Sequence, residues 1–235
     1  MDKKSSPQQR RSSLGIRSQR RVREILGAAR EVFGEKGFEK TTIFEIAQRL
    51  GTSEATVFTY FESKRELCME VLRGWYYEIS AELEREVALV EGFRGRLDFV
   101  IRKHLKHLIE EGTGICALVL SEGRNVDQEF TDLITDIKRR YTAPLMAALA
   151  AAQKSGEIRP DIPLRLMRDM VYGSMEHILW GHIQGKPLPD VNLTASQLSD
   201  LLWRAFMPPR QQIEALVQFR AEVADALHRL EQTYA

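Results

Sequence analysis

Apolar side chains recur every three or four positions along almost the whole chain. Between Val22 and Phe33 they fall on one face of a helix, and the same spacing continues from residue 93 onward. No segment sustains the alternation of a strand, and the sequence holds no Asn-Gly or Asp-Gly hairpin turn. The pattern predicts an all-α fold, with later helices near residues 94–110, 114–122, 126–155, 163–184, 195–206 and 209–233.

Helix starts and stops are marked clearly in the first third of the chain. Glycine favours the end of a helix, and a hydroxyl or carboxylate side chain favours its start. Two short helices should therefore follow the first one, and a long helix should lead away from them. The signals are glycine stops at Gly37 and Gly51, a cap at Ser53, and capping-box pairs at Thr42 with Glu45 and Ser63 with Glu66.

Two short helices joined by a tight glycine turn have the geometry of a helix-turn-helix, here at residues 42–61. The second helix of such a unit enters the DNA major groove, so one face must be buried and the other exposed. Val57 and Phe61, with Phe58 as a further candidate, can anchor the buried face. The outer face offers hydroxyls and one carboxylate to phosphates and bases, from Ser53, Glu54, Thr56, Thr59 and Tyr60.

The charge is distributed unevenly, although the net charge is only +1. The first 23 residues hold eight Lys and Arg against one acid, Asp2. Residues 1–16 have almost no apolar content and are interpreted as a basic disordered arm. An arm directly ahead of a helix-turn-helix favours DNA contact, with a solvated tail as the alternative.

The totals exclude several classes of protein. A chain of 235 residues suits two domains, and its apolar runs fall short of the roughly 18 residues of a membrane span. The N-terminus lacks the apolar stretch of a secretory signal. The two cysteines, Cys68 and Cys116, sit among apolar neighbours and indicate buried thiols in a reducing cytoplasm. No membrane association, metal or cofactor is expected.

Residues 41–72, TTIFEIAQRLGTSEATVFTYFESKRELCMEVL, resemble the DNA-binding signature of the TetR family of transcriptional regulators. The shared positions are Thr41, Thr42, Ile46, Ala47, Gly51, Ser53, Tyr60, Phe61, Ser63, Lys64 and Leu67. The resemblance implies a homodimeric repressor that binds a palindromic operator in double-stranded DNA and leaves it when a small effector binds. It also implies an N-terminal three-helix DNA-binding domain at 17–67 and a helical ligand-binding and dimerisation domain at 68–208.

The resemblance assigns DNA contacts to matching positions. Thr42 and Lys64 would bind phosphates. Relatives often carry a cation in the recognition helix, whereas this helix carries none, so Lys64 and the arm are expected to supply positive charge. The positions lining the recognition helix are Ser53, Glu54, Ala55, Thr56, Phe58, Thr59 and Tyr60.

Two further sites are expected in the second domain. In the family, two late helices of each subunit form the dimer interface, and segments 163–184 and 195–206 are the candidates. Met and aromatic side chains among the helices of 94–180 can shape an adaptable effector cavity, with ordinary core packing as the alternative. Residues 155–173 weakly resemble fatty-acid-metabolism members that respond to acyl-CoA, which favours a hydrophobic effector. The cavity candidates are Phe99, Leu118, Ile137, Tyr141, Leu145, Tyr172, Met175 and Trp180.

Other classes of function have less support. No nucleophile motif, phosphate-binding glycine loop or zinc-protease motif occurs, which argues against an enzyme. His104 and His107 could share a metal, but surface histidines are the favoured interpretation. A helical protein-interaction module without DNA binding is the other alternative. The additional C-terminal helix, within 209–235, is expected either to pack on the dimer interface or to cover the protein's own core.

Overall fold

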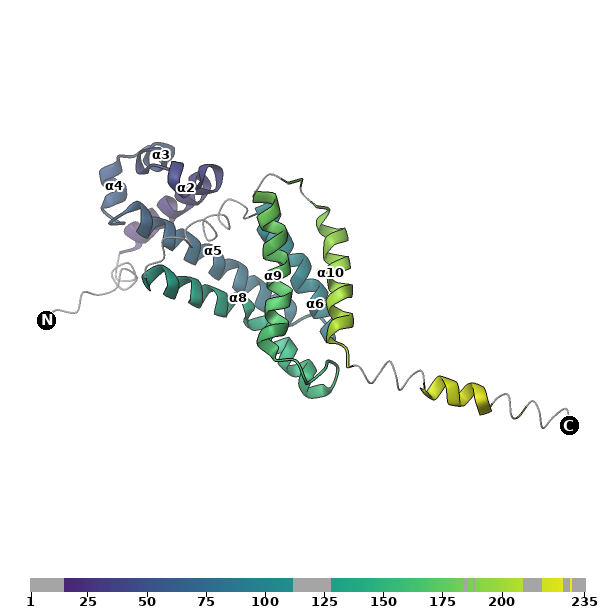
Figure 1. Cartoon of the computed structure of the whole chain (residues 1–235). Coiled ribbons are helices and arrows are strands. Elements are labelled where there is room, and N and C mark those ends of the chain that lie inside the picture. The colour runs from purple at the N-terminus through teal and green to yellow at the C-terminus, as the bar shows by residue number, and fades with distance from the viewer. Residues whose placement is uncertain are drawn as a thin grey trace.

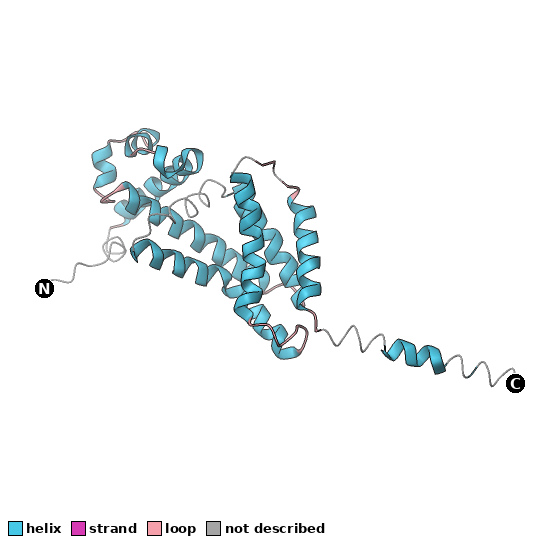
Figure 2. Ribbon diagram, viewed as in Figure 1, coloured by secondary structure: helices cyan, strands magenta, loops and turns pink. Residues whose placement is uncertain are grey.

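The computed structural model describes residues 15–111, 128–183, 186–187, 189–208, 217–225 and 229. Every element in these ranges is helical, as the apolar spacing predicts (Figure 2). Figure 1 shows a small N-terminal unit of α2, α3 and α4, from which α5 leads into a larger bundle. No helix in the described ranges is both long enough and apolar enough to cross a membrane.

The N-terminal unit consists of α2 (Ile16–Lys40), α3 (Ile43–Arg49) and α4 (Glu54–Phe58). Gly37 interrupts α2 with φ 75° and ψ 172°, a backbone region open essentially to glycine alone. The expected stop is therefore a break, after which the helix continues to Lys40. One face of each helix is buried in a shared core that includes Ile25, Phe33, Ile46, Val57 and Phe61.

The expected caps fix the starts of α3, α4 and α5. Thr42 accepts a hydrogen bond from the backbone N–H of Glu45, whose carboxylate accepts one from the N–H of Thr42, so the capping box is complete. Ser53 and Ser63 each accept from the N–H three residues further along. The carboxylate of Glu66 accepts a hydrogen bond from the N–H of Glu62, one residue before the Ser63 cap.

The larger bundle contains five α-helices and one π-helical turn in the described ranges. They are α5 (Lys64–Val87), α6 (Phe93–Lys106), η1 (His107–Glu111), α8 (Gln128–Ser155), α9 (Leu164–Ile183) and α10 (Val191–Phe206). The helix α5 packs along α8, and α10 packs on α6 (Figure 1). Because α5 crosses from the small unit into the bundle without a break, one rigid element connects the two parts.

Among the described residues, the later helices begin and end close to the expected positions, apart from one start. The helix expected from residue 195 starts at Val191, because the carboxylate of Asp190 accepts from the N–H of Leu193 and caps it earlier. The helix expected at 114–122 and the residues Cys116 and Leu118 lie outside the described residues. Of the helix expected at 209–233, residues 217–225 are described; they are helical and exposed, so this stretch does not cover the protein's own core.

Candidate DNA-binding surface and effector cavity

The recognition helix is anchored by two of its three candidate side chains. Val57 and Phe61 are fully buried, whereas 48% of Phe58 is exposed, so Phe58 lies on the outer face. Thr56 and Tyr60 are half-buried at the border between the two faces. The remaining expected DNA contacts are exposed: Ser53, Glu54, Ala55 and Thr59, together with Thr42 at the start of α3.

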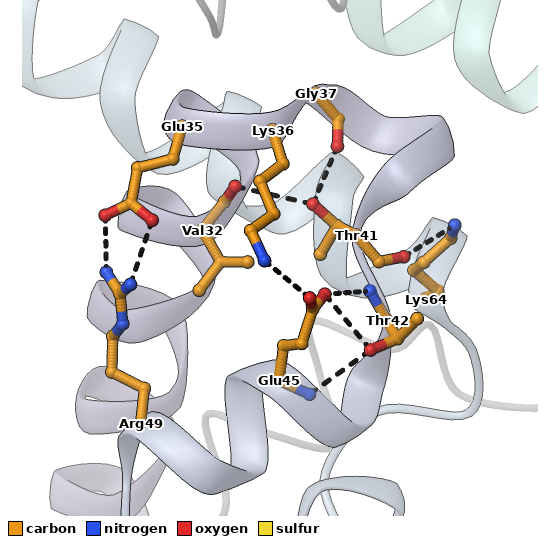
Figure 3. Close-up of polar contacts among 9 residues, drawn as sticks. All are labelled: Val32, Glu35, Lys36, Gly37, Thr41, Thr42, Glu45, Arg49 and Lys64. Carbon is orange, nitrogen blue, oxygen red and sulfur yellow. Dashed lines mark hydrogen bonds and ion pairs between the residues drawn. The ribbon is translucent and has the colours of Figure 1, made fainter.

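The side chain of Lys64 makes hydrogen bonds within the protein, close to the recognition helix. Its ammonium donates to the carbonyl of Thr41 at 3.0 Å (Figure 3). It also donates to the carbonyl of Phe38 at 2.9 Å and lies 4.3 Å from the centre of the Phe38 ring. The first turn of α5 is thereby fastened to the segment between α2 and α3. An ammonium has three N–H donors, so one remains that can reach a phosphate.

Thr41 is the buried counterpart of the exposed Thr42. Its hydroxyl donates to the carbonyl of Gly37 at 2.6 Å and also lies 3.4 Å from the carbonyl of Val32 (Figure 3). The side chain is 1% exposed, so its hydrogen bonds are shielded from water. Thr41 and Lys64 together hold the turn that positions α3.

Cations on the helix-turn-helix are partly engaged by nearby acids. Arg49 makes two hydrogen bonds to Glu35, at 2.7 and 2.9 Å, and Lys36 lies 2.5 Å from a carboxylate oxygen of Glu45 (Figure 3). The contact with Lys36, followed by the N–H of Thr42, lowers the pKa of Glu45 to about 2. These pairs leave less net positive charge on this part of the surface.

A cavity of about 810 Å³ opens in the second domain among α5, α6, α8 and α9. One part of its wall is apolar or aromatic, and another part carries four cations and two carboxylates. The apolar and aromatic members include Tyr76, Leu108, Tyr141, Met146, Tyr172 and Leu179. The charged members are Lys138, Arg139, Arg165, Arg168, Asp169 and Glu176.

A second hollow of about 830 Å³ lies between α5 and α8. Its wall is built largely of alanines, with Tyr77, Glu84, Arg96 and Arg140 as larger polar members. The hydroxyl of Tyr77 donates to Asp136 at 2.8 Å. Of these two cavities, the one of about 810 Å³, called the first cavity below, therefore combines an aromatic wall with a cluster of cations.

Three rings meet in the aromatic part of the first cavity. The Nδ1 atom of His104 lies 2.8 Å from the hydroxyl of Tyr141, and the ring of Tyr172 stands edge-on to His104 with 4.9 Å between centres. Burial, and secondarily the neighbouring His107, lowers the pKa of His104 to about 3. Burial raises the pKa of the Tyr172 hydroxyl. Both groups are therefore neutral at physiological pH.

The interpretation of His104 and His107 as surface histidines is wrong. His104 is 5% and His107 is 2% exposed, because the end of α6 and the start of η1, which carry them, pack against the bundle. No group of three or more metal-ligating side chains occurs in the described part of the chain.

Comparison with known sequences identifies both parts of the chain. The profile of the bacterial regulatory proteins of the tetR family matches residues 25–71, and that of the C-terminal region of YsiA-like protein matches residues 73–203. The chain belongs to the TetR family. It is accordingly a DNA-binding transcriptional regulator with a ligand-binding domain, not an enzyme, and the alternative of an interaction module without DNA binding is set aside.

Individual TetR-family relatives are distant in sequence but similar in fold. The fatty acid metabolism regulator protein of Bacillus subtilis is 23% identical over 179 residues, or 76% of this chain and 92% of the relative. The repressor KstR2 of Rhodococcus jostii is 26% identical and covers 61% of this chain and 70% of its own length.

Two solved structures have the same fold. FadR of Bacillus subtilis, in complex with stearoyl-CoA, has a TM-score of 0.68 at 23% identity and covers 76% of this chain and 96% of its own. A putative regulator of Saccharomonospora viridis, in complex with choline, has a TM-score of 0.72 at 22% identity, covering 81% and 99%.

The structure of this TetR-family regulator brings two of the expected cavity residues together. Tyr141 and Tyr172 line the 810 Å³ cavity. The cationic members of its wall were not anticipated, although Arg165, Arg168, Tyr172 and Glu176 follow one another at spacings of three and four and could have been found as one helix face. The expected residues that do not line the cavity are Phe99, Ile137, Leu145, Met175 and Trp180.

The buried histidine predicts an acid-sensitive fold. The pKa of His104 is lower in the folded protein than in the unfolded chain, so the unfolded chain gains a proton first as the pH falls. The free energy of unfolding should therefore decrease by roughly 1.4 kcal/mol per pH unit between about pH 6.5 and pH 3 from this group. Urea unfolding across this range measures the slope. His104→Phe should flatten it, whereas His177→Phe, at an exposed position of α9, should not.

Proposed function

We propose that this TetR-family regulator is a repressor that a fatty acyl-CoA releases from a palindromic operator. The observation that carries the proposal is the 810 Å³ cavity, whose wall joins an apolar and aromatic part to four cations. An acyl chain fits the first part, and the phosphates of CoA fit the second. The structure of the Bacillus subtilis relative in complex with stearoyl-CoA supports this chemistry.

The dimer interface is proposed on the outer faces of α9 and α10, which lie side by side (Figure 1). Large apolar side chains are exposed there, although an isolated protein in water gains by burying them. A second copy related by a two-fold axis would cover them and present two recognition helices to two half-sites. The exposed side chains are Leu166, Met170, Leu193 and Leu201.

Release is proposed to act through α5. This helix begins at Lys64, beside the recognition helix, and carries Tyr76 in the cavity wall, roughly 18 Å further along at 1.5 Å per residue. An effector that binds more tightly when α5 is tilted would shift the population toward that state. The two recognition helices would then no longer match the spacing of the half-sites.

The test has two steps. Selection of bound sequences from a random DNA pool is expected to enrich a palindromic operator. Titration of that complex with palmitoyl-CoA and stearoyl-CoA should then release the DNA, whereas CoA alone should not. Failure to enrich any site contradicts operator binding. Enrichment followed by no release contradicts the acyl-CoA effector alone.

A further inference from the structure

Two polar atoms of residues that line the cavity are buried without a hydrogen-bond partner among the described residues. They are the Nε2 atom of His104 and the hydroxyl of Tyr172, whose side chains are 5% and 6% exposed. Both residues line the cavity. Nearly all buried polar atoms in folded proteins are paired, so two orphans in one cavity wall indicate a partner that arrives with the ligand.

The role of each atom follows from an assigned direction of the neighbouring hydrogen bond. The Tyr141 hydroxyl lies 2.8 Å from Nδ1 of His104, and assigning the hydroxyl as the donor of that bond places the ring proton of neutral His104 on Nε2. Burial lowers the pKa of His104 and raises that of the Tyr172 hydroxyl, so the imidazole stays neutral and the hydroxyl keeps its proton. The cavity therefore presents two uncharged donors, an N–H and an O–H, from rings that meet edge-on.

We propose that His104 and Tyr172 bind the carbonyl oxygen of the effector's acyl group. This inference rests on the proposed acyl-CoA effector, and it places the thioester carbonyl of that effector beside His104 and Tyr172. A carbonyl oxygen has two lone pairs, which match two neutral donors. The phosphates have their own partners in Arg165 and Arg168 and the other cations of the wall.

Other ligand groups fit these two donors less well. A quaternary ammonium such as choline would suit the aromatic rings, but it offers no acceptor at its charged end and would face the cations of the wall. A free carboxylate is matched better by the guanidinium groups than by a neutral imidazole. The uncharged thioester carbonyl is the acceptor of an acyl-CoA that directly adjoins the apolar chain, whereas the amide carbonyls of the pantetheine arm lie nearer to the phosphates.

The experiment compares two ligands that differ at this oxygen. Palmitoyl-CoA has the carbonyl, and S-hexadecyl-CoA has a methylene in its place. The wild-type protein is expected to bind the thioester about tenfold more tightly, the effect of a satisfied pair of buried donors. Isothermal titration of the full-length protein measures both dissociation constants.

Tyr172→Phe removes one donor and keeps the ring. Because the hydroxyl has no hydrogen-bond partner among the described residues, its loss is not expected to lower the melting temperature. The variant should lose most of the preference for palmitoyl-CoA and bind S-hexadecyl-CoA as the wild type does. Tyr77→Phe is the matched control, because its hydroxyl lies in the other hollow, bonded to Asp136; it should keep the preference.

The outcomes distinguish a failure of the carbonyl contact from a failure of the acyl-CoA effector. Equal binding of both ligands by the wild type, or an unchanged preference in Tyr172→Phe, overturns the carbonyl contact and leaves the acyl-CoA effector standing. Equal weakening of both ligands in Tyr172→Phe shows a structural role and overturns the contact in the same way. Binding of neither ligand, with or without binding of choline, overturns the acyl-CoA effector and the contact together.

Discussion

Leu201→Glu is expected to convert the regulator into a monomer and to reduce operator affinity by about 10²–10⁴-fold, the gain that a linked second half-site contributes. Leu201 is 63% exposed on α10. If α9 and α10 form the dimer interface, a two-fold axis brings two copies of the new carboxylate into an apolar contact. Buried charges without partners are costly, so the interface should separate. Sedimentation equilibrium measures the association, and a fluorescence titration with operator DNA measures the affinity.

The control for this prediction is another exposed leucine. Leu89 is 83% exposed in the turn between α5 and α6, off the proposed interface. Leu89→Glu should leave both the dimer and the operator affinity unchanged. A Leu201→Glu protein that remains a dimer and binds DNA normally would place the interface on another face.

Lys64→Met is expected to weaken both the DNA-binding domain and its complex with DNA. The substitution keeps a long side chain against Phe38 but removes two hydrogen bonds to the carbonyls of Phe38 and Thr41. The free energy of unfolding should fall by about 1–3 kcal/mol, because those carbonyls are left without this donor. Operator affinity should fall by about tenfold or more, since the first turn of α5 is no longer held to the turn before α3.

Salt dependence separates the two roles of Lys64. A direct phosphate contact contributes about 0.9 to the slope of log affinity against log salt concentration, so the slope should become shallower by about that amount. A role confined to holding the turn would weaken binding with the slope unchanged. Lys154→Met, at an exposed position in the last turn of α8, is the control and should alter neither stability nor DNA binding. A Lys64→Met protein with unchanged stability and unchanged operator affinity would contradict both roles.

Much of the DNA-binding surface could be predicted from the sequence. The cap at Thr42 and the anchors Val57 and Phe61 appear as expected, and the stop expected at Gly37 is a break within α2. Each depends on residues within a few positions of one another, where backbone geometry fixes the contact. Phe58 was harder to place, because a five-residue helix is too short for its spacing to define a single buried face.

The cavity was predicted less completely. Apolar spacing identified Tyr141 and Tyr172 as inward-facing, and it did so equally for Leu145 and Met175, which lie in the core away from the cavity. Spacing shows which face of a helix is buried. It does not show where the buried faces of neighbouring helices leave a cavity between them. His104 is the same case, since its burial depends on how α6 packs with α8 and α9.

The sequence by itself determined that this protein is all-helical and carries a helix-turn-helix, because helix starts, stops and faces are set by residues three or four apart. Only the tertiary structure decided that Lys64 is bonded to residues 23 and 26 positions earlier. It also decided that His104 and Tyr172 share a cavity wall, each with a buried polar atom that has no hydrogen-bond partner among the described residues. Such contacts join residues far apart in the chain, and their existence depends on the distances and angles at which the packed helices meet.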